Sequence, residues 1–179
     1  WLNENPATPN PAYFENVDNL VELASSLGLI LAMQPTWGYY VNDVQIVTTD
    51  NAFEYGRWLG ARYREAPNII WVLGGDRIPT GFEGVTRQLA AGLRVGDGGA
   101  HLISYHPCGE RSSAQFFHSE AWLDFNMIET WTAWSRVYPS VQTDTLLFPT
   151  KLVVLAEGAY EDGPEYPMGP ITPLIVRRQ

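Results

Sequence analysis

Helical and strand-like patterns alternate along the whole chain of 179 residues. Five short apolar runs, which start near residues 29, 69, 101, 125 and 152, have the composition of buried strands. The segments between them carry apolar residues at helical spacing. Nearly continuous apolar strands with helices on their connections indicate a parallel sheet. The chain is therefore predicted to be an α/β protein.

Local signals predict where the helices begin and end. Asn10, which precedes a proline, is suited to cap the first helix, and Gly28 is suited to end it. We expect Asp50 to cap the second helix and Gly96 to follow the third. Shorter helical segments are predicted near residues 113–123 and 139–147.

The spacing of the predicted strands limits the topology without fixing it. Successive strands start about 31 residues apart on average, which is the period of one strand–helix unit in a (β/α)₈ TIM barrel. Five strands would suit an open doubly wound sheet equally well. Both architectures place functional groups at the C-terminal ends of the strands, so those ends are where the chemistry is expected.

Composition excludes several classes of partner and cofactor. The net charge of −9 argues against binding to nucleic acid, because phosphate binding depends on clustered Lys and Arg. No apolar run is long enough to span a membrane. The lone Cys108 permits neither an internal disulfide nor a cysteine-based zinc site, and the three histidines lack metal-binding spacing. We therefore expect no metal or other cofactor, and oligomeric state is not constrained.

The predicted strand ends carry carboxylates, aromatic rings and one histidine, and no glycine-rich phosphate loop. Glycoside hydrolysis needs one protonated and one ionised carboxyl group on opposite sides of a glycosidic oxygen. Aromatic rings suit the C–H faces of a sugar, so this inventory favours a carbohydrate substrate. In chain order the strand ends carry Gln34, Thr36 and Trp37, then Asp76 and Arg77, then Tyr105 and His106, then Glu129 and Trp131, then Glu157, Tyr160 and Glu161.

Asp76 and Glu157 are the candidate catalytic carboxylates. Asp76 follows five apolar residues and two glycines, which allow a sharp turn and leave room for a ligand. The alternative for Asp76 is a turn residue or a helix cap beside Arg77. Glu157 follows the apolar run 152–156, where an unpaired carboxylate would be costly to bury. The alternative for Glu157 is an ion pair with an arginine such as Arg77.

The other strand-end side chains are candidate substrate contacts. Glu129 is a third carboxylate, although residues 129–134 are interpreted as the start of a loop. His106 is suited to orient a carboxylate or a substrate hydroxyl, and its alternative is a hydrogen-bonded histidine with a structural role. The full set of candidate substrate-binding residues is Trp37, Arg77, Tyr105, His106, Glu129, Trp131, Tyr160 and Glu161.

Several segments resemble the apiosidase-like glycoside hydrolases, a family 140-like group. The run 68–77 (NIIWVLGGDR) is the most specific of them, and together they cover nearly the whole chain in order. The other matching segments are 10–14, 17–18, 34–38, 55–57, 59–60, 105–107, 111–113, 124–128, 157–158 and 160–162.

The resemblance implies a TIM barrel of the large clan of retaining glycosidases. In that clan the acid/base follows the fourth strand and the nucleophile follows the seventh, which correspond to Asp76 and Glu157 here. Many members of the wider clan have Asn-Glu at the acid/base position, where this chain has Gly75-Asp76. The resemblance also implies a secreted or periplasmic enzyme that acts on side chains of plant or other polysaccharides.

Counting back from Glu157 makes the five strands the third to seventh of a barrel. Residues 1–179 are therefore expected to be one incomplete catalytic-domain segment that lacks the first two strands and the last. Two other functions stay open from the sequence. One is a non-catalytic carbohydrate-binding protein, and the other is an open α/β sheet with an unrelated hydrolase activity.

Overall fold

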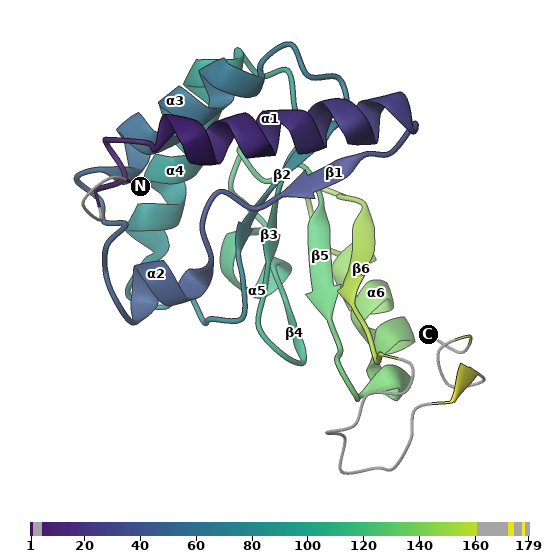
Figure 1. The fold of residues 1–179 in the computed structure, drawn as a ribbon. Coiled ribbons are helices and arrows are strands. Elements are labelled where there is room, and N and C mark those ends of the chain that lie inside the picture. Colours follow the sequence, from purple (N-terminus) through teal and green to yellow (C-terminus); the bar gives the residue numbers. More distant parts are fainter. Residues whose placement is uncertain (2–4, 161–171, 174–176, 178–179) are drawn as a thin grey trace. The chain divides into compact units, whose positions relative to one another are not determined.

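The computed structural model of the protein describes residues 1, 5–160, 172–173 and 177. The chain forms two compact units, Trp1–Ser104 and Tyr105–Gln179. The order of the helices and strands can be followed in Figure 1. None of the described helices is long and apolar enough to cross a membrane.

The first unit combines helices with a sheet whose strand order is β1-β2-β3. Strands β1 and β2 are parallel, with Leu31 beside Ile69 and Met33 beside Trp71. The boundary between the units falls inside β3. The elements are α1 (Pro11–Ser26), β1 (Leu31–Met33), α2 (Gly38–Asn42), α3 (Ala52–Tyr63), β2 (Ile69–Gly74), α4 (Glu83–Asp97) and β3 (Ile103–His106).

The second unit contains a sheet with the order β4-β5-β6. Strands β5 and β6 are parallel, whereas β4 and β5 are antiparallel. The five predicted strands are therefore present, and the prediction of an α/β protein with parallel pairing is confirmed. The elements are β4 (Arg111–Ser112), α5 (Ala114–Phe117), β5 (Asn126–Glu129), η2 (Trp134–Arg136), α6 (Val137–Thr145) and β6 (Val153–Glu157).

The predicted helix signals were only partly right. Asn10 does cap α1, because its side chain accepts a hydrogen bond from the Ala12 N–H at 3.2 Å. The prediction for Asp50 was wrong, since α3 begins at Ala52 after Asn51. The prediction for Gly96 was also wrong: α4 continues to Asp97, and Gly98, with a φ of 68°, follows its end.

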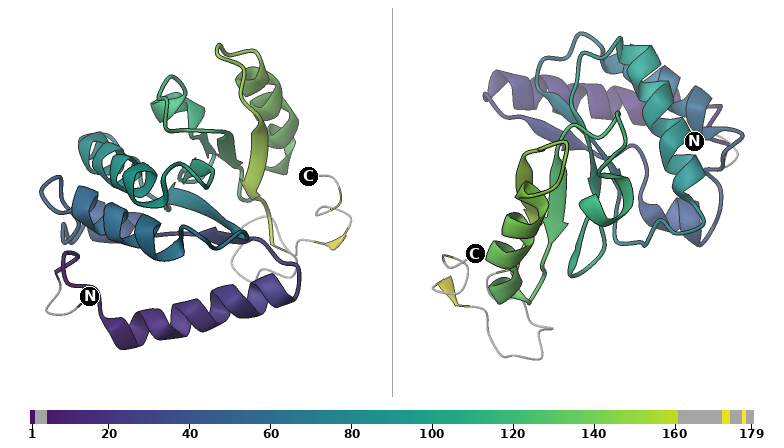
Figure 2. Two further views of the ribbon diagram at one scale, coloured as in Figure 1. Left: turned by 90° about the horizontal axis from the view of Figure 1, so that it is seen from above. Right: turned by 180° about the vertical axis from the view of Figure 1, so that it is seen from behind.

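Gly96 lies inside α4 because α3 and α4 pack unusually close together, side by side in Figure 2. A Cβ atom on Gly60 would lie 2.5 Å from the Leu93 carbonyl oxygen, and one on Gly56 would lie 2.5 Å from that of Leu89. On α4, a Cβ on Gly96 would overlap the backbone of α3 in the same way. The glycines thus serve helix packing, which outweighs their low helix propensity.

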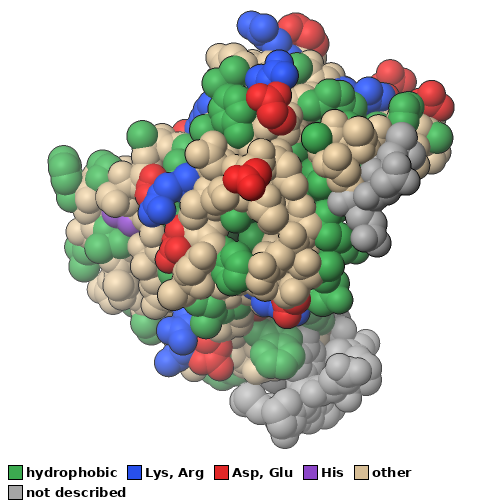
Figure 3. Space-filling view, turned by 90° about the vertical axis from the view of Figure 1, so that its left-hand side faces the viewer, with side chains coloured by type: hydrophobic (Ala, Val, Ile, Leu, Met, Phe, Trp, Pro, Cys, Tyr) green, Lys and Arg blue, Asp and Glu red, His purple; other side chains and the backbone are tan. Residues whose placement is uncertain are grey.

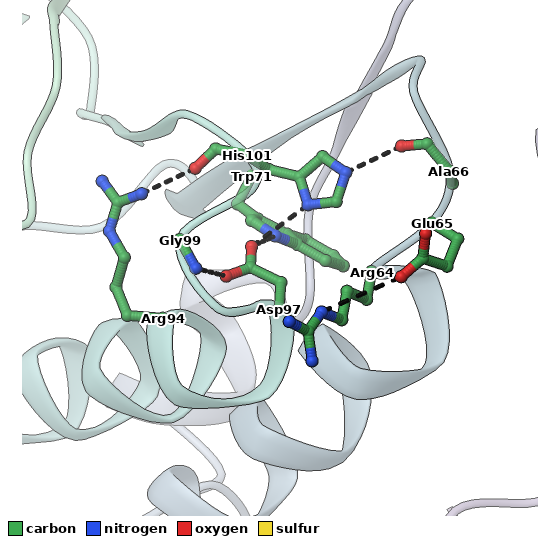
Figure 4. Close-up of polar contacts among 8 residues, drawn as sticks. All are labelled: Arg64, Glu65, Ala66, Trp71, Arg94, Asp97, Gly99 and His101. Carbon is green, nitrogen blue, oxygen red and sulfur yellow. Dashed lines mark hydrogen bonds and ion pairs between the residues drawn. The ribbon is translucent and has the colours of Figure 1, made fainter.

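A buried carboxylate joins three segments of the first unit (Figure 4). Asp97 accepts hydrogen bonds from the Trp71 indole N–H at 3.1 Å and from the Gly99 N–H at 2.7 Å. His101 Nδ1 lies 3.1 Å from the same carboxylate, and its Nε2 lies 2.7 Å from the Ala66 carbonyl oxygen. The end of α4, the middle of β2 and the approach to β3 are therefore tied to one side chain.

Several charged side chains of the first unit lie in pairs of opposite sign, among them Arg57 with Glu54 and Arg62 with Asp18. Arg62 contacts Asp18 at 2.5 Å, and this hydrogen-bonded guanidinium holds the pKa of the Asp18 carboxyl below its usual value. Figure 3 shows acidic and basic side chains interspersed on one face, with no large patch of a single sign. Exposed pairs of this kind contribute little to stability, so the fold depends on its core.

Replacing Asp97 with alanine is predicted to destabilise the first unit strongly. The change leaves the buried Trp71 N–H and the His101 ring without their acceptor, which should lower the free energy of unfolding by about 3 kcal/mol. Chemical denaturation of the intact gene product, followed by tryptophan fluorescence, measures the loss. Asp50→Ala is the matched control, because Asp50 is exposed and should change stability by less than about 0.5 kcal/mol. Equal stability of the two variants would contradict this account.

Candidate active site

The turn that carries Asp76 is built for close contacts. Gly74, Gly75 and Asp76 follow one another with φ values of 85°, 106° and 54°. A side chain on Gly75 would overlap the Gln34 amide and would come within 2.5 Å of the Trp37 ring. Gln34 Nε2 donates to the Gly74 carbonyl oxygen at 2.7 Å. Only glycine fits position 75, and the turn presents the Asp76 carboxyl at the exposed end of β2.

Asp76 is held by its neighbours rather than acting as a helix cap. The Trp37 indole N–H donates to Asp76 Oδ2 at 3.1 Å. The helix-cap alternative is wrong, because α4 begins several residues later, after Phe82. Arg77 is bound by Asp43 at 2.7 Å, and its guanidinium lies 5.5 Å from the centroid of the Trp37 ring. Arg77 Nη1 also donates to the Asp76 carbonyl oxygen at 3.0 Å, so Asp76 is held by Trp37 at its side chain and by Arg77 at its backbone.

In the second unit, Glu157 is the last residue of β6 and is contacted on both oxygens. His106 Nε2 lies 3.2 Å from Glu157 Oε2, and the Tyr160 hydroxyl donates to Oε1. His106 Nδ1 lies 3.7 Å from Glu129 Oε2. The imidazole ring therefore stands between two strand-end carboxylates.

An irregularity in the β5–β6 pairing brings these carboxylates side by side. Ile128 pairs with Leu155, but Glu129 pairs with Glu157, so Ala156 is an extra residue on β6. Bulges of this kind redirect side chains and are common beside functional sites. Without the bulge, Glu129 would pair with Ala156, and Glu157 would lie one residue further along β6 than the partner of Glu129.

The contacts of His106 specify where its protons lie. The Pro107 carbonyl oxygen, 2.9 Å from Nδ1, can only accept a hydrogen bond, so Nδ1 carries a hydrogen. The close approach of Nε2 to Glu157 then needs one further proton between these two groups, on either the imidazole or the carboxyl group.

His106, Glu129 and Glu157 also have the donor types of a metal site, and their ligand atoms lie within 4.8 Å of one another. The two carboxylates, however, approach different nitrogens of the same ring, and Nδ1 is hydrogen-bonded to Pro107. A single ion can bind only one of those nitrogens, so the geometry fits a hydrogen-bonded chain better. The absence of a metal cofactor stays a prediction.

The whole chain matches a known family of catalytic domains. The model of the apiosidase-like catalytic domain matches residues 1–179. The chain belongs to the apiosidase-like family. The predicted resemblance to this family is therefore confirmed.

Solved structures agree with this assignment. A family 5 glycoside hydrolase from Bacteroides vulgatus matches with 32% identity and a TM-score of 0.74, over 84% of this chain and 35% of that one. A second structure, described as a glycoside hydrolase, matches with 30% identity and a TM-score of 0.73, over 84% and 37%. This apiosidase-like chain thus spans about a third of the length of the structures it matches. A search of curated proteins gave no significant match.

The other predicted substrate contacts of the apiosidase-like chain have different settings. Trp37 and Trp131 are 41% and 43% exposed, so both rings are accessible. Tyr105 is only 2% exposed and packs on Phe117, with the ring centroids 4.8 Å apart. Its ring packs in the core of the second unit, and its contact with substrate stays a prediction. Glu161 lies outside the described residues.

The position expected for Glu129 needs correction, and two residues that contact Arg77 were not predicted. Glu129 was expected at the start of a loop, but it is the buried last residue of β5. Asp43 and Tyr39 were missed, although they hold Arg77 through an ion pair and a ring contact at 6.0 Å. Tyr39 lies on the five-residue helix α2 and Asp43 follows its last residue, and a helix this short gives no helical pattern in the sequence.

Cys108 is predicted to be a poor nucleophile in the folded chain. Burial raises the pKa of its thiol, and the nearby Glu129 charge raises it further. Because the thiolate is the reactive form, alkylation by iodoacetamide at pH 8 should be slower in the native chain than in guanidinium chloride. Mass spectrometry of timed samples measures both rates. Faster alkylation of the native chain would contradict this reading and would reopen a role for the thiol.

Proposed function

We propose that this chain carries the two carboxylates of a retaining glycoside hydrolase, with Glu157 as the nucleophile and Asp76 as the acid/base. Membership of the apiosidase-like family supports hydrolysis of a glycosidic bond. The observation that carries the assignment is the setting of Glu157, whose two oxygens are contacted by His106 and Tyr160. These contacts fix the direction in which the carboxylate can attack.

The proposed reaction has two steps. Glu157 attacks the anomeric carbon while protonated Asp76 donates its proton to the departing glycosidic oxygen, which leaves a covalent glycosyl–enzyme. In the second step ionised Asp76 takes a proton from water, and the resulting hydroxide displaces Glu157 with net retention of configuration. The exposure of Asp76 supports this role, since an acid/base must exchange protons with leaving groups and water.

Trp37 and Arg77 form the immediate surroundings of Asp76. The Trp37 N–H orients Oδ2 without adding charge. The Arg77 guanidinium, fixed by Asp43, supplies a nearby positive charge that does not move with the substrate. Our proposed contacts around the substrate are Trp37, Trp131, Arg77, His106, Glu129 and Tyr160.

We further propose that residues 1–179 correspond to strands three to seven of a (β/α)₈ barrel. The short length relative to the matching structures supports this view. So does the apolar surface along α1 and β1, where Leu20, Leu27 and Ile30 are all exposed. The proposed substrate is a side chain of a plant or other polysaccharide, and a secreted or periplasmic location stays a prediction of the resemblance.

Glu157→Gln and Asp76→Asn are predicted to remove turnover of aryl glycosides by the intact gene product. Loss of the nucleophile should reduce kcat by at least about 10³-fold, and loss of the acid/base by about 10²- to 10⁴-fold. Steady-state assays on a panel of aryl glycosides measure both. Azide should restore activity to each variant, giving a glycosyl azide of inverted configuration for Glu157→Gln and of retained configuration for Asp76→Asn.

The matched controls are Glu15→Gln and Asp50→Asn, which alter exposed carboxylates far along the sequence from either candidate and should keep full activity. Turnover that survives both active-site changes would contradict the assignment. An intact wild-type protein that binds sugars without hydrolysing any of the panel would instead favour the carbohydrate-binding alternative.

Residues 1–179 produced alone are predicted to fold poorly. Large exposed aliphatic side chains on α1 and an unpaired edge at β1 favour self-association. Light scattering should show a heterogeneous species, and thermal unfolding followed by circular dichroism should be broad. A monodisperse, cooperatively unfolding monomer would contradict the incomplete-barrel proposal.

A further inference from the structure

A cleft of about 500 Å³ lies in the first unit, where side chains of α1 meet the end of α3 and the connection to β2. This volume is within the range of small-molecule sites. Asn68, which lines the cleft, directly precedes β2, whereas the candidate acid/base Asp76 follows that strand. The cleft and the candidate acid/base therefore lie at opposite ends of β2.

A buried amide in the wall of this cleft has an acceptor without a partner. Asn68 is only 7% exposed, and its Nδ2 donates to the carbonyl oxygens of Val21 at 3.1 Å and Leu29 at 3.2 Å. Because a carbonyl oxygen can only accept, these two contacts fix which end of the amide is nitrogen. Asn68 Oδ1 then has no hydrogen-bond partner among the described residues. A buried acceptor without a donor is costly, so this atom favours a ligand that brings an N–H or O–H group.

A buried phenol in the same wall also has capacity for a ligand. Tyr63 is 4% exposed, and its hydroxyl makes no hydrogen bond within the described part of the chain. Burial and the nearby Asp18 carboxylate raise the pKa of this phenol, so the hydroxyl keeps its proton at neutral pH. A neutral phenol can both donate and accept. The cleft therefore offers a ligand one amide oxygen and one hydroxyl group.

The charged groups around the cleft are mostly acidic. They are the carboxylates of Asp18, Glu22 and Glu65 and the guanidinium of Arg62. Arg62 donates to both oxygens of Asp18 and lies 5.3 Å from the centroid of the Trp58 ring, so it is held in place. Glu65 lies 3.9 Å from Arg64 (Figure 4). The described residues give Glu22 no such ion pair, so its charge can attract a cation.

We propose that this cleft binds an organic cation of the guanidinium class. A guanidinium group is planar and carries several N–H donors, which suit Asn68 Oδ1 and the Tyr63 hydroxyl, and its charge complements Glu22. An anion would be repelled by the carboxylates. A metal ion fits less well, since the carboxylates of this cleft do not form a described cluster with metal-ligand spacing. This binding is independent of the proposed hydrolysis.

The test uses calorimetric titration of the intact gene product with butylguanidinium and with butylurea, its neutral isostere. We expect butylguanidinium to bind at least about tenfold more tightly, because only the cation gains from Glu22. A third probe, arginine capped at both ends, shows where the group comes from. Tighter binding of capped arginine than of butylguanidinium indicates a protein side chain as the ligand, and the reverse indicates a free small molecule.

Two variants test the groups that the proposal invokes. Glu22→Gln should weaken binding of butylguanidinium about fivefold to tenfold through loss of the charge. Tyr63→Phe keeps the ring that packs on Trp71 and should weaken binding about fivefold. Since the hydroxyl has no described partner, Tyr63→Phe should not lower the thermal midpoint of unfolding. A purely structural role of Tyr63 would show the opposite pattern.

Each variant has a matched control on α1. Glu15→Gln removes an exposed carboxylate two helical turns before Glu22, and Tyr13→Phe removes an exposed hydroxyl; neither residue is in the described lining. Both should keep the parent affinity within about twofold. Asp76→Asn should also bind normally, because its carboxyl lies at the other end of β2.

The inference would be overturned if butylguanidinium does not bind, which would leave the cleft to water, or if butylurea binds as tightly. Unchanged affinity in both Glu22→Gln and Tyr63→Phe would also overturn it. So would loss of binding in Asp76→Asn, which would place the cation at the candidate active site. Turnover of glycosides enters none of these comparisons, so the inference and the proposed function can fail separately.

Discussion

Asp97 accepts hydrogen bonds from Trp71 and Gly99 and lies 3.1 Å from His101 Nδ1, and the position of β2 depends on this buried carboxylate. Trp71 lies in the middle of β2, and its backbone N–H also donates to the Leu102 carbonyl oxygen at 2.8 Å. Both the side chain and the backbone of Trp71 therefore hold β2 in place. The C-terminal end of β2 leads into the Gly74-Gly75-Asp76 turn. The position of the candidate acid/base therefore depends on the buried contact between Trp71 and Asp97.

In the second unit a β-bulge and a histidine, rather than a buried carboxylate, position the candidate catalytic residue. There the bulge at Ala156 brings Glu129 and Glu157 into register, and His106 stands between the two carboxylates. Each carboxylate would be costly to hold at a strand end without such partners. The candidate carboxylates of both units therefore lie where strands end, and the strands that precede Asp76 and Glu129 are mostly buried.

Sequence patterns were sufficient for the strands and the residue chemistry of their ends, because burial imposes apolar runs and the chain must leave them at polar residues. They failed where tertiary contacts decide. Gly96 has the local character of a helix stop but serves the α3–α4 contact, and Glu129 was expected in a loop but is the last residue of β5. The Asp43–Arg77 ion pair joins residues far apart in sequence, so no local pattern reveals it.

The central claim is that Glu157 forms a covalent bond to the sugar. The most direct measurement is mass spectrometry of the intact gene product after reaction with an activated 2-deoxy-2-fluoroglycoside that matches its best aryl glycoside substrate. The account predicts one glycosyl adduct, located by peptide mapping on Glu157 and lost when the trapped enzyme is given an acceptor sugar. An adduct on another residue, or turnover that gives a product of inverted configuration, would contradict it.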